Sequence, residues 1–496
     1  MKFSEHTRTI TIEIICLLYI VLFVYAAASK LLDFENFQVQ LGQSPLLSAF
    51  AGWVSWGVPI SELVISLLLI FRRYRLVGLY AAFGIMVMFT SYIVIILNFS
   101  SFVPCSCGGI LEKLSWTEHL FFNVIFIALA FIGILLIKAD KGTGSGIRVP
   151  ILVTTICSSA CVFGLFLLSE DMIHNRNNFI RRFPNHLALL TNEFNLKYTS
   201  YYIAGLDQST IYLANVKAPL QLTLIDTSLQ RQEIITIKLP KTDFVFRSVK
   251  VQVKPPYFYV SDGTVPCIFR GKVSDWKASL WMHGKAYFTH MEPVTPKKVA
   301  IRALSSKNHE NILGTIDFQD NVEVHVSDEL LEKQIDGVFD TDGMLLYNDK
   351  LRKLIYTYYY RNEYLLVDDL LRLESVGKTI DTTSKAKITV AYINSRKESK
   401  MASPPFSVNK NTATFGNYLF VQASLIGKYE SFEMWDVASI VDVYDVVKKT
   451  YVFSFYISDK NAVKMSEFRV LDDLVVVLSG KYLSTYRLNN RFYENK

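Results

Sequence analysis

The chain has 496 residues, more than one ordinary domain needs, so we expect at least two structural units. Its charge is unevenly spread: about 11% of residues 1–169 are charged, against about 24% of residues 170–496. Only the second value is ordinary for a soluble domain, which excludes a wholly soluble protein. A hydrophobic content of 51% excludes a disordered chain, and six cysteines are too few for a disulfide-stapled scaffold. The net charge of +7 includes no basic run long enough to indicate a nucleic-acid partner.

Five segments are apolar and long enough to cross a bilayer, whose hydrocarbon core takes about 20 residues of helix. They are residues 9–29, 48–71, 76–99, 119–137 and 149–169. Basic residues in short loops mark the cytoplasmic side of a membrane protein. The N-terminus and the loops after the second and fourth segments are basic, and all three fall on one side if every segment crosses. This pattern predicts a cytoplasmic N-terminus and places everything after residue 169 outside.

The end of the first segment allows a second interpretation. The run Ala26-Ala27-Ala28-Ser29 resembles a signal-peptidase site after a short apolar stretch. Cleavage there would leave four spanning segments in the same orientation.

The remainder of the chain reads as β structure. From about Tyr198, short runs rich in Tyr, Phe, Val and Ile alternate with turns such as Asp262-Gly263 and Asp342-Gly343. Two pairs of strands show a recurring pattern: a strand predicted at 200–205 is followed by one at 211–215, and a strand at 417–422 is followed by one at 433–437. Only a short stretch bearing Glu467 reads as helical. At about 40–50 residues per blade, this length predicts a propeller of about six blades. A pair of β-sandwiches is the alternative.

The expected organisation is therefore a membrane α-helical bundle followed by an all-β domain. Its boundaries are four helices in 1–140, a fifth helix in 141–170, a linker in 171–197 and the propeller in 198–496. The β part shows no Ser-His-Asp order, metal-ligand cluster or phosphate loop. Its scattered histidines, including His283, His290 and His309, read as surface residues, and Cys267 reads as a small core residue.

The loop between the third and fourth apolar segments carries the clearest chemical signal. It contains Cys105 and Cys107, followed by Gly108 and Gly109. A disulfide between cysteines one residue apart closes a very small, strained ring. Strained, exposed disulfides are the labile or catalytic ones, so this pair is predicted to be redox-active in an oxidising outer compartment. The alternative is a thiolate site for Zn or Cu(I), which needs three or four ligands, and the sequence shows no fourth.

His119 is the candidate partner of these thiols. On a helix that starts near Ser115, with Glu118 completing a capping box, its ring is expected to point back toward the cysteine loop. An imidazolium or the positive end of the helix lowers a thiol pKa and favours the thiolate. The alternative is that His119 and Trp116 anchor the helix at the level of the lipid headgroups.

Glu62 lies in the middle of the second apolar segment. A carboxylate at that depth costs about 2.5–3.5 kcal/mol on insertion scales, so it is expected to face the bundle interior and to have a partner. The predicted roles are a proton relay or a contact to a membrane quinone. The alternative is a structural hydrogen bond to a neighbouring helix.

Cys157 and Cys161 are four residues apart, so they share one face of the fifth apolar segment. One interpretation is an electron relay from the loop thiols. The other is close helix packing, for which small residues are commonly used in membranes. Cys16 in the first segment is isolated and receives no role.

Residues 8–140 resemble the MauE/DoxX family of redox-associated membrane proteins, as found in Bacteroidetes-type bacteria. The resemblance rests on three stretches: 28–34 with Phe37, Pro59-Ile60-Ser61-Glu62-Leu63, and Pro104-Cys105-Ser106-Cys107-Gly108-Gly109 with Trp116, His119 and Asn123. It includes the first segment as a retained helix, against cleavage after Ala28. It implies thiol or disulfide handling in the periplasm through Cys105 and Cys107, in support of a partner protein. The β domain looks like propeller-like extensions of such proteins, which carry no assigned activity.

The expected function is that of a bacterial inner-membrane protein whose Cys-x-Cys loop exchanges thiols with a periplasmic client or a thioredoxin-like protein. The propeller would dock the client, and electrons would pass to a quinone or a second thiol carrier. A different class of function is a non-enzymatic sensor or assembly scaffold, whose propeller binds an envelope protein or peptide and whose cysteines form a passive bridge. A thiolate metal carrier is a third possibility.

Overall fold

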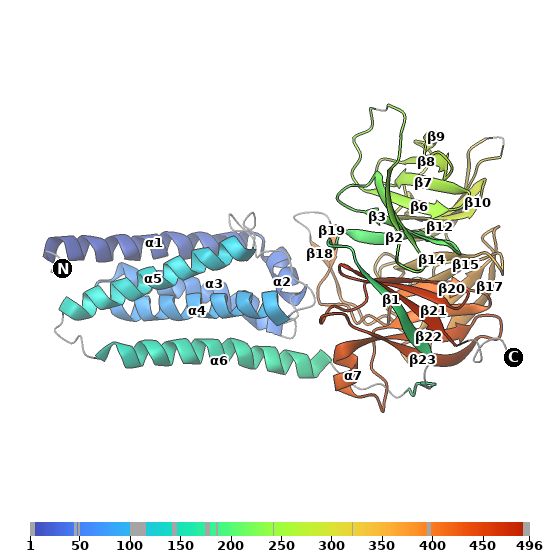
Figure 1. The fold of residues 1–496 in the computed structure, drawn as a ribbon. Helices are drawn as coiled ribbons and strands as arrows, with labels where there is room; N and C mark the ends of the chain where they lie inside the picture. Colours follow the sequence, from blue (N-terminus) through green and yellow to red (C-terminus); the bar gives the residue numbers. More distant parts are fainter. Residues whose placement is uncertain are drawn as a thin grey trace. The chain divides into compact units, whose positions relative to one another are not determined.

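A computed structural model describes residues 5–43, 47, 50–99, 116–140, 146–173, 179–184, 187–241, 243–319, 321–393 and 398–489. The chain divides into two compact units. The first comprises Met1–Asn175 with Ile388–Pro405, and the second comprises Arg176–Lys387 with Phe406–Lys496. The helices of the first unit and the sheets of the second are labelled in Figure 1.

Within the described residues of the first unit, five helices are long and apolar enough to cross a membrane, as the sequence predicts. They are α1 (Glu5–Leu32), α3 (Ala51–Ile70), α4 (Arg75–Phe99), α5 (Trp116–Asp140) and α6 (Arg148–Ile173). Their outward side chains are largely exposed Leu, Ile, Val and Phe, which suits contact with lipid.

A sixth helix, α2 (Phe34–Gln43), lies in the segment that was expected to be an outer loop. It is too short and too polar to register as a spanning segment. It forms because Phe37 and Leu41, four residues apart, share one face and are both buried against the bundle.

The helical core is formed where small residues let the helices approach closely. Tyr19 and Phe23 of α1 are fully buried, and the Tyr19 hydroxyl donates to the Phe126 carbonyl of α5 at 2.5 Å. A Cβ on Gly78 of α4 would lie 2.8 Å from a side-chain methyl of Leu69 of α3, so a larger residue there would have to displace that side chain. On the other side of α4, the hydroxyls of Ser91 and Ser159 lie 3.1 Å apart and join α4 to α6.

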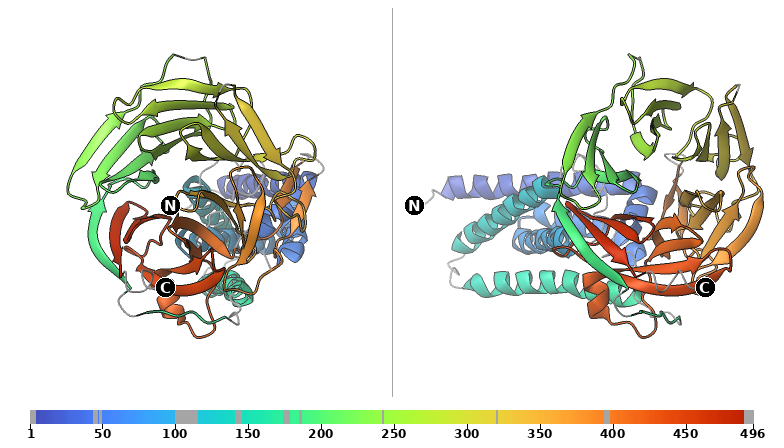
Figure 2. Two further views of the ribbon diagram at one scale, coloured as in Figure 1. Left: turned by 90° about the vertical axis from the view of Figure 1, so that its right-hand side faces the viewer. Right: turned by 45° about the vertical axis from the view of Figure 1, so that its right-hand side comes forward.

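The second unit is a six-bladed β-propeller, as predicted, with four antiparallel strands in each blade (Figure 2). The first three blades are β2 (Tyr201–Leu206), β3 (Thr210–Asn215), β4 (Gln221–Asp226) and β5 (Gln232–Thr236); β6 (Val249–Lys254), β7 (Tyr257–Asp262), β8 (Cys267–Lys272) and β9 (Ala278–His283); and β10 (His290–Thr295), β11 (Lys298–Leu304), β12 (Asn311–Asp317) and β13 (Glu323–Ser327).

The next two blades are β14 (Gly343–Asn348), β15 (Lys353–Tyr358), β16 (Glu363–Val367) and β17 (Leu373–Lys378); and β20 (Asn409–Phe415), β21 (Tyr418–Ala423), β22 (Ala438–Asp445) and β23 (Thr450–Ser458). Between them, β18 (Val390–Ile393) and β19 (Glu398–Met401) form a separate hairpin that belongs to the first compact unit.

The last blade closes the ring. Its strand order is β1-β26-β25-β24, so its outermost strand, β1 (Ala188–Asn195), comes from the start of the domain. The other three strands, β24 (Glu467–Leu471), β25 (Leu474–Ser479) and β26 (Tyr482–Leu488), come from its end. Part of the stretch 171–197, expected as a linker, is therefore a propeller strand. Pairing of β1 with β26 joins the start of the domain to its end and holds the ring of blades closed.

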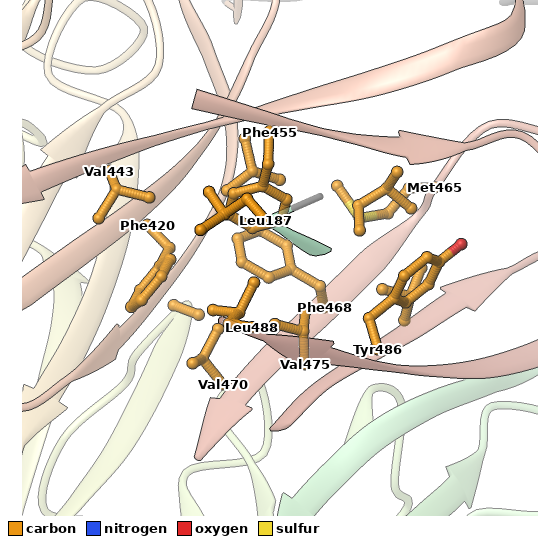
Figure 3. Close-up of a cluster of buried hydrophobic side chains, with 14 of the residues drawn as sticks. Leu187, Phe420, Val443, Phe455, Met465, Phe468, Val470, Val475, Tyr486 and Leu488 are labelled. Carbon is orange, nitrogen blue, oxygen red and sulfur yellow. The ribbon is translucent and has the colours of Figure 1, made fainter. Parts of the chain in front are cut away.

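A cluster of buried apolar side chains fills the space between the fifth and last blades (Figure 3). Phe468 of β24 is fully buried there, among Phe420, Phe455, Val475 and Leu488. Leu187, just before β1, joins the same cluster, so the closing strand and the last blade share one core.

Two local predictions are wrong. Residues 433–437, expected as a strand, lie in the short helix α7 (Phe432–Val437), whose first turn is capped by Ser431 accepting from the Met434 amide. Residues 467–471, expected as helical, form strand β24 instead. The stretch is too short to show a helical period, and alternate burial of Phe468 and Val470 selects the strand.

The predicted turn at Asp262-Gly263 is built around the carboxylate. Asp262 accepts hydrogen bonds from the amides of Ser248 and Arg247 at 2.8 and 2.7 Å. Burial alone would raise the pKa of Asp262, but these donors outweigh it and lower the pKa to about 2. Gly263 is required because a Cβ there would lie 1.9 Å from the Phe288 carbonyl oxygen.

The segment that enters the propeller is held by a buried arginine. Arg181 Nε lies 2.7 Å from Asp442 Oδ1, and its Nη1 lies 2.8 Å from Glu430 Oε1. Only 1% of the arginine side chain is exposed. The next residue, Arg182, accepts from the Ser454 amide at 2.8 Å. We call residues 179–184 the tether, since they bind the edge of the fifth blade directly after the last apolar helix.

We expect Phe468→Ala to lower the free energy of unfolding of the propeller by about 3–5 kcal/mol, because it leaves a cavity in a closely packed core. Pulse proteolysis of the full chain across a urea series would measure the change. Leu189→Ala, at a half-exposed position of β1, is the control and should cost less than about 0.5 kcal/mol. Equal effects would contradict the role given to this cluster.

Arg181→Met should cost about 3–5 kcal/mol, because it leaves two buried carboxylates without their cation. The same proteolysis series would report it. Arg182→Met is the matched control, since Arg182 is exposed and its guanidinium bonds to the Tyr451 carbonyl. Its loss should cost no more than about 1 kcal/mol. A small effect at Arg181 would show that the tether does not depend on this ion pair.

Candidate functional site

The helical unit encloses an apolar cavity of about 680 Å³. All six helices contribute to its wall, each through residues three or four positions apart on one face. On α3 they include Val54, Gly57, Val58, Ser61, Glu62 and Ile65. Its size lies in the range of small-molecule pockets, which combine apolar walls with a few polar groups.

The first polar feature of the cavity is a buried ion pair. Lys30, in the last turn of α1, places its Nζ 2.7 Å from Glu62 Oε1 of α3. The two side chains are 11% and 1% exposed. A charge in the bilayer interior needs a partner, and Lys30 supplies it. Glu62 faces the bundle interior, as predicted from its depth.

The pair leaves acceptor capacity unused. Glu62 Oε2 is buried and has no hydrogen-bond partner within the described part of the chain. Pro59, one turn earlier on α3, has no amide hydrogen, so the helix is already weakened beside Glu62. A buried polar atom without a hydrogen bond costs free energy. Glu62 Oε2 therefore marks a position where a hydrogen-bond donor would be stabilising.

His119 and Asn123 supply the second polar feature. They are four residues apart at the start of α5, share a face and both line the cavity. His119 Nδ1 and Asn123 Nδ2 are buried and lack hydrogen-bond partners among the residues the structure describes. The rings of Trp116 and His119 are 6.4 Å apart. The cavity wall thus offers a donor amide, an imidazole nitrogen and a carboxylate oxygen.

The structure brings together some of the predicted site residues and not others. Glu62 and His119 line one cavity, whereas Cys105 and Cys107 lie outside the described residues, as does Ser115. Cys157 and Cys161 of α6 are exposed and are not among the residues that line the cavity. Cys16 is buried in the core of the bundle. In the described residues, no three His, Cys, Asp or Glu side chains are placed to hold a metal ion.

Sequence reasoning missed two members of this site. Lys30 and Asn123 appeared only as positions of the family resemblance, without a chemical role. The four-residue spacing from His119 to Asn123 signalled a shared face. The pairing of Lys30 with Glu62 joins two helices, so no local spacing indicated it.

The comparisons with known proteins separate the two units. Residues 8–136 match the model of the family described as methylamine utilisation protein MauE. A comparison with curated proteins gives no match.

Solved structures resemble part of the chain at low identity. A member of the DUF4221 family from Bacteroides vulgatus is 12% identical with a TM-score of 0.40, covering 64% of this chain and 99% of that one. BamB from Moraxella catarrhalis is 12% identical with a TM-score of 0.32, covering 57% and 84%. A protein of unknown function from Bacteroides thetaiotaomicron is 11% identical with a TM-score of 0.38, covering 60% and 72%. These scores carry no functional conclusion.

The five apolar helices and the family match indicate a membrane protein. Its segment 8–136 is similar to the family described as methylamine utilisation protein MauE, and the chain joins that segment to a six-bladed β-propeller.

Proposed function

We propose that the helical unit is a thiol–disulfide oxidoreductase of the bacterial inner membrane, which passes electrons from Cys105 and Cys107 to a quinone in the cavity. The observation that carries the proposal is the cavity itself. Its wall is apolar, and it presents the Lys30–Glu62 pair beside His119 Nδ1 and Asn123 Nδ2, neither of which has a hydrogen-bond partner among the described residues.

The cysteine loop is covalently joined to this cavity. Residues 100–115 connect Phe99, the last residue of α4, to Trp116, the first residue of α5 and part of the cavity wall. Cys107 precedes Trp116 by nine residues, a span of at most about 30 Å when fully extended. His119 lies one turn further along α5. Chain length therefore limits how far Cys107 can lie from Trp116, and the proposal requires the loop to approach the end of the cavity that His119 lines.

The residues present fit a quinone. Its ring carries two carbonyl oxygens, which accept hydrogen bonds, and its tail is apolar. The Asn123 amide is placed to donate to one oxygen, and the Lys30 ammonium supplies positive charge close to the same cavity. When bound, a quinone supplies the capacity to take up two electrons and two protons.

The reaction balances with these groups. A client dithiol exchanges with the Cys105–Cys107 disulfide and leaves as a disulfide. The reduced pair then gives up two electrons and two protons, which a bound quinone would take up, and closes its S–S bond again. His119 Nδ1 accepts a thiol proton, and Glu62 holds a proton at Oε2 for delivery to the cavity. Lys30 holds the Glu62 carboxylate in place.

The topology in this proposal puts the N-terminus in the cytoplasm and the cysteine loop in the periplasm, as the basic loops predict. The propeller would hold the client, a role that its fold permits without specifying.

We expect the full chain in nanodiscs, reduced and desalted, to convert added decylubiquinone to its quinol, measured by ultraviolet absorbance. Cys105→Ser and Cys107→Ser should each abolish the conversion, because a single thiol cannot close the bond. A double variant that reduces the quinone as fast as the natural protein would refute the proposal. A pair that stays oxidised under reductant, by differential alkylation, would favour the passive bridge of a scaffold.

Glu62→Gln should slow quinone reduction by about 100-fold through loss of proton transfer. Oxidation of the same thiols by diamide should be unchanged, which separates loss of the cavity's chemistry from loss of the cysteines. Glu13→Gln is the matched control, since Glu13 lies on α1 outside the cavity and pairs with Arg72 at 2.8 Å. Full activity of Glu62→Gln would remove Glu62 from the proposed site.

A further inference from the structure

An insertion in the fifth blade exposes apolar side chains beside the tether. It runs between β21 and β22 and includes α7, in which no residue is buried. Tyr429 is 73% exposed, Val437 57%, Phe432 41% and Met434 40%. We call residues 427–437 the blade-five insertion. Soluble surfaces rarely gather apolar groups in this way unless they meet a partner or a membrane.

The insertion is bound directly to the tether. The Glu430 carboxylate forms an ion pair with the Arg181 guanidinium. The Lys428 amide donates a hydrogen bond to the Phe179 carbonyl at 2.9 Å. Arg181 also donates to the Leu425 carbonyl at 3.0 Å, just before the insertion. The insertion is therefore fixed to residues 179–181 by one buried ion pair and one hydrogen bond, and the Leu425 bond holds the chain just before it.

Chain length then limits how far the insertion can lie from the bilayer. Phe179 follows Ile173, the last residue of α6, by six residues. Six Cα–Cα steps reach at most about 23 Å. The apolar part of α6 ends at Leu168, one helical turn before Ile173. The tether thus keeps the insertion within a few nanometres of the membrane that holds α6, whatever the path of the chain between them.

The composition of the insertion fits an interfacial site. Tyr, Trp and Phe are enriched at the level of the lipid headgroups, and lysines commonly flank them. The insertion has Tyr429, Phe432 and Trp435, with Lys428 next to Tyr429 and Lys464 Nζ bonded to the Trp435 carbonyl at 2.6 Å. A helix of six residues is also small for a stable protein interface, which buries about 800 Å² on each partner.

We propose that the blade-five insertion rests on the bilayer that holds α6, with Tyr429, Phe432 and Met434 reaching into the headgroup layer. Arg181 then has two linked roles. It anchors the propeller to its own tether, and it positions the insertion where the membrane can receive it. The partner in this proposal is the lipid surface.

The test uses the full chain in phosphatidylcholine nanodiscs, with p-benzoylphenylalanine replacing Tyr429, or Phe432 in a second variant. After irradiation, we expect a mass increase of one phosphatidylcholine molecule on the peptide that carries the photoreactive group. The control replaces Tyr287, which is 70% exposed in the loop between β9 and β10 of another blade, and should give no lipid adduct.

Three outcomes overturn the proposal: no lipid adduct at either position, adducts of equal yield at Tyr287, or adducts to protein alone. Because Tyr429 and Phe432 are both exposed, replacing one leaves the fold and the other position available for the test. The result is independent of quinone reduction, so it neither depends on the proposed enzymatic activity nor supports it.

Discussion

The arrangement of the helices around the cavity depends on how one carboxylate, Glu62, is accommodated in an apolar environment. Glu62 is 1% exposed, and a charge so deeply buried persists only with a partner. Lys30 provides that partner at 2.7 Å, which joins the end of α1 to the middle of α3. The cavity opens beside this pair, and His119 and Asn123 complete its polar wall. Among the described residues, Glu62 Oε2, His119 Nδ1 and Asn123 Nδ2 have no hydrogen-bond partner, and a small ligand with polar substituents is one kind of group that can satisfy such atoms in an apolar pocket.

The propeller depends on two connections made near its start. Strand β1 pairs with β26, so the ring is closed by residues separated by almost the whole domain. The tether precedes β1 and is held by Arg181 between Asp442 and Glu430. Both connections bring the segment that follows the last apolar helix onto the final two blades. The start of the propeller is thus fixed by buried contacts to its own final blades, in addition to the linker sequence.

Much of the architecture followed from local patterns. Runs of about 20 apolar residues identify five spans because the bilayer core has a set thickness, and a blade repeat of 40–50 residues identifies six blades. The misses have a common cause. The helix α2, the helix α7 and the strand β24 are all short, and at that length burial by distant residues outweighs propensity. Strand β1 was missed because its partner lies almost 300 residues away.

For the site, the sequence by itself determined which groups are chemically notable. Glu62 stands out because a carboxylate in an apolar run is costly, and His119 because it follows the Cys-x-Cys loop. Only the tertiary structure decided that Lys30 pairs with Glu62, that His119 and Asn123 face the same cavity, and that Cys157 and Cys161 lie outside its wall. Spacing within one helix indicates which residues share a face, but the neighbour that a face meets is set by packing between helices far apart in the chain.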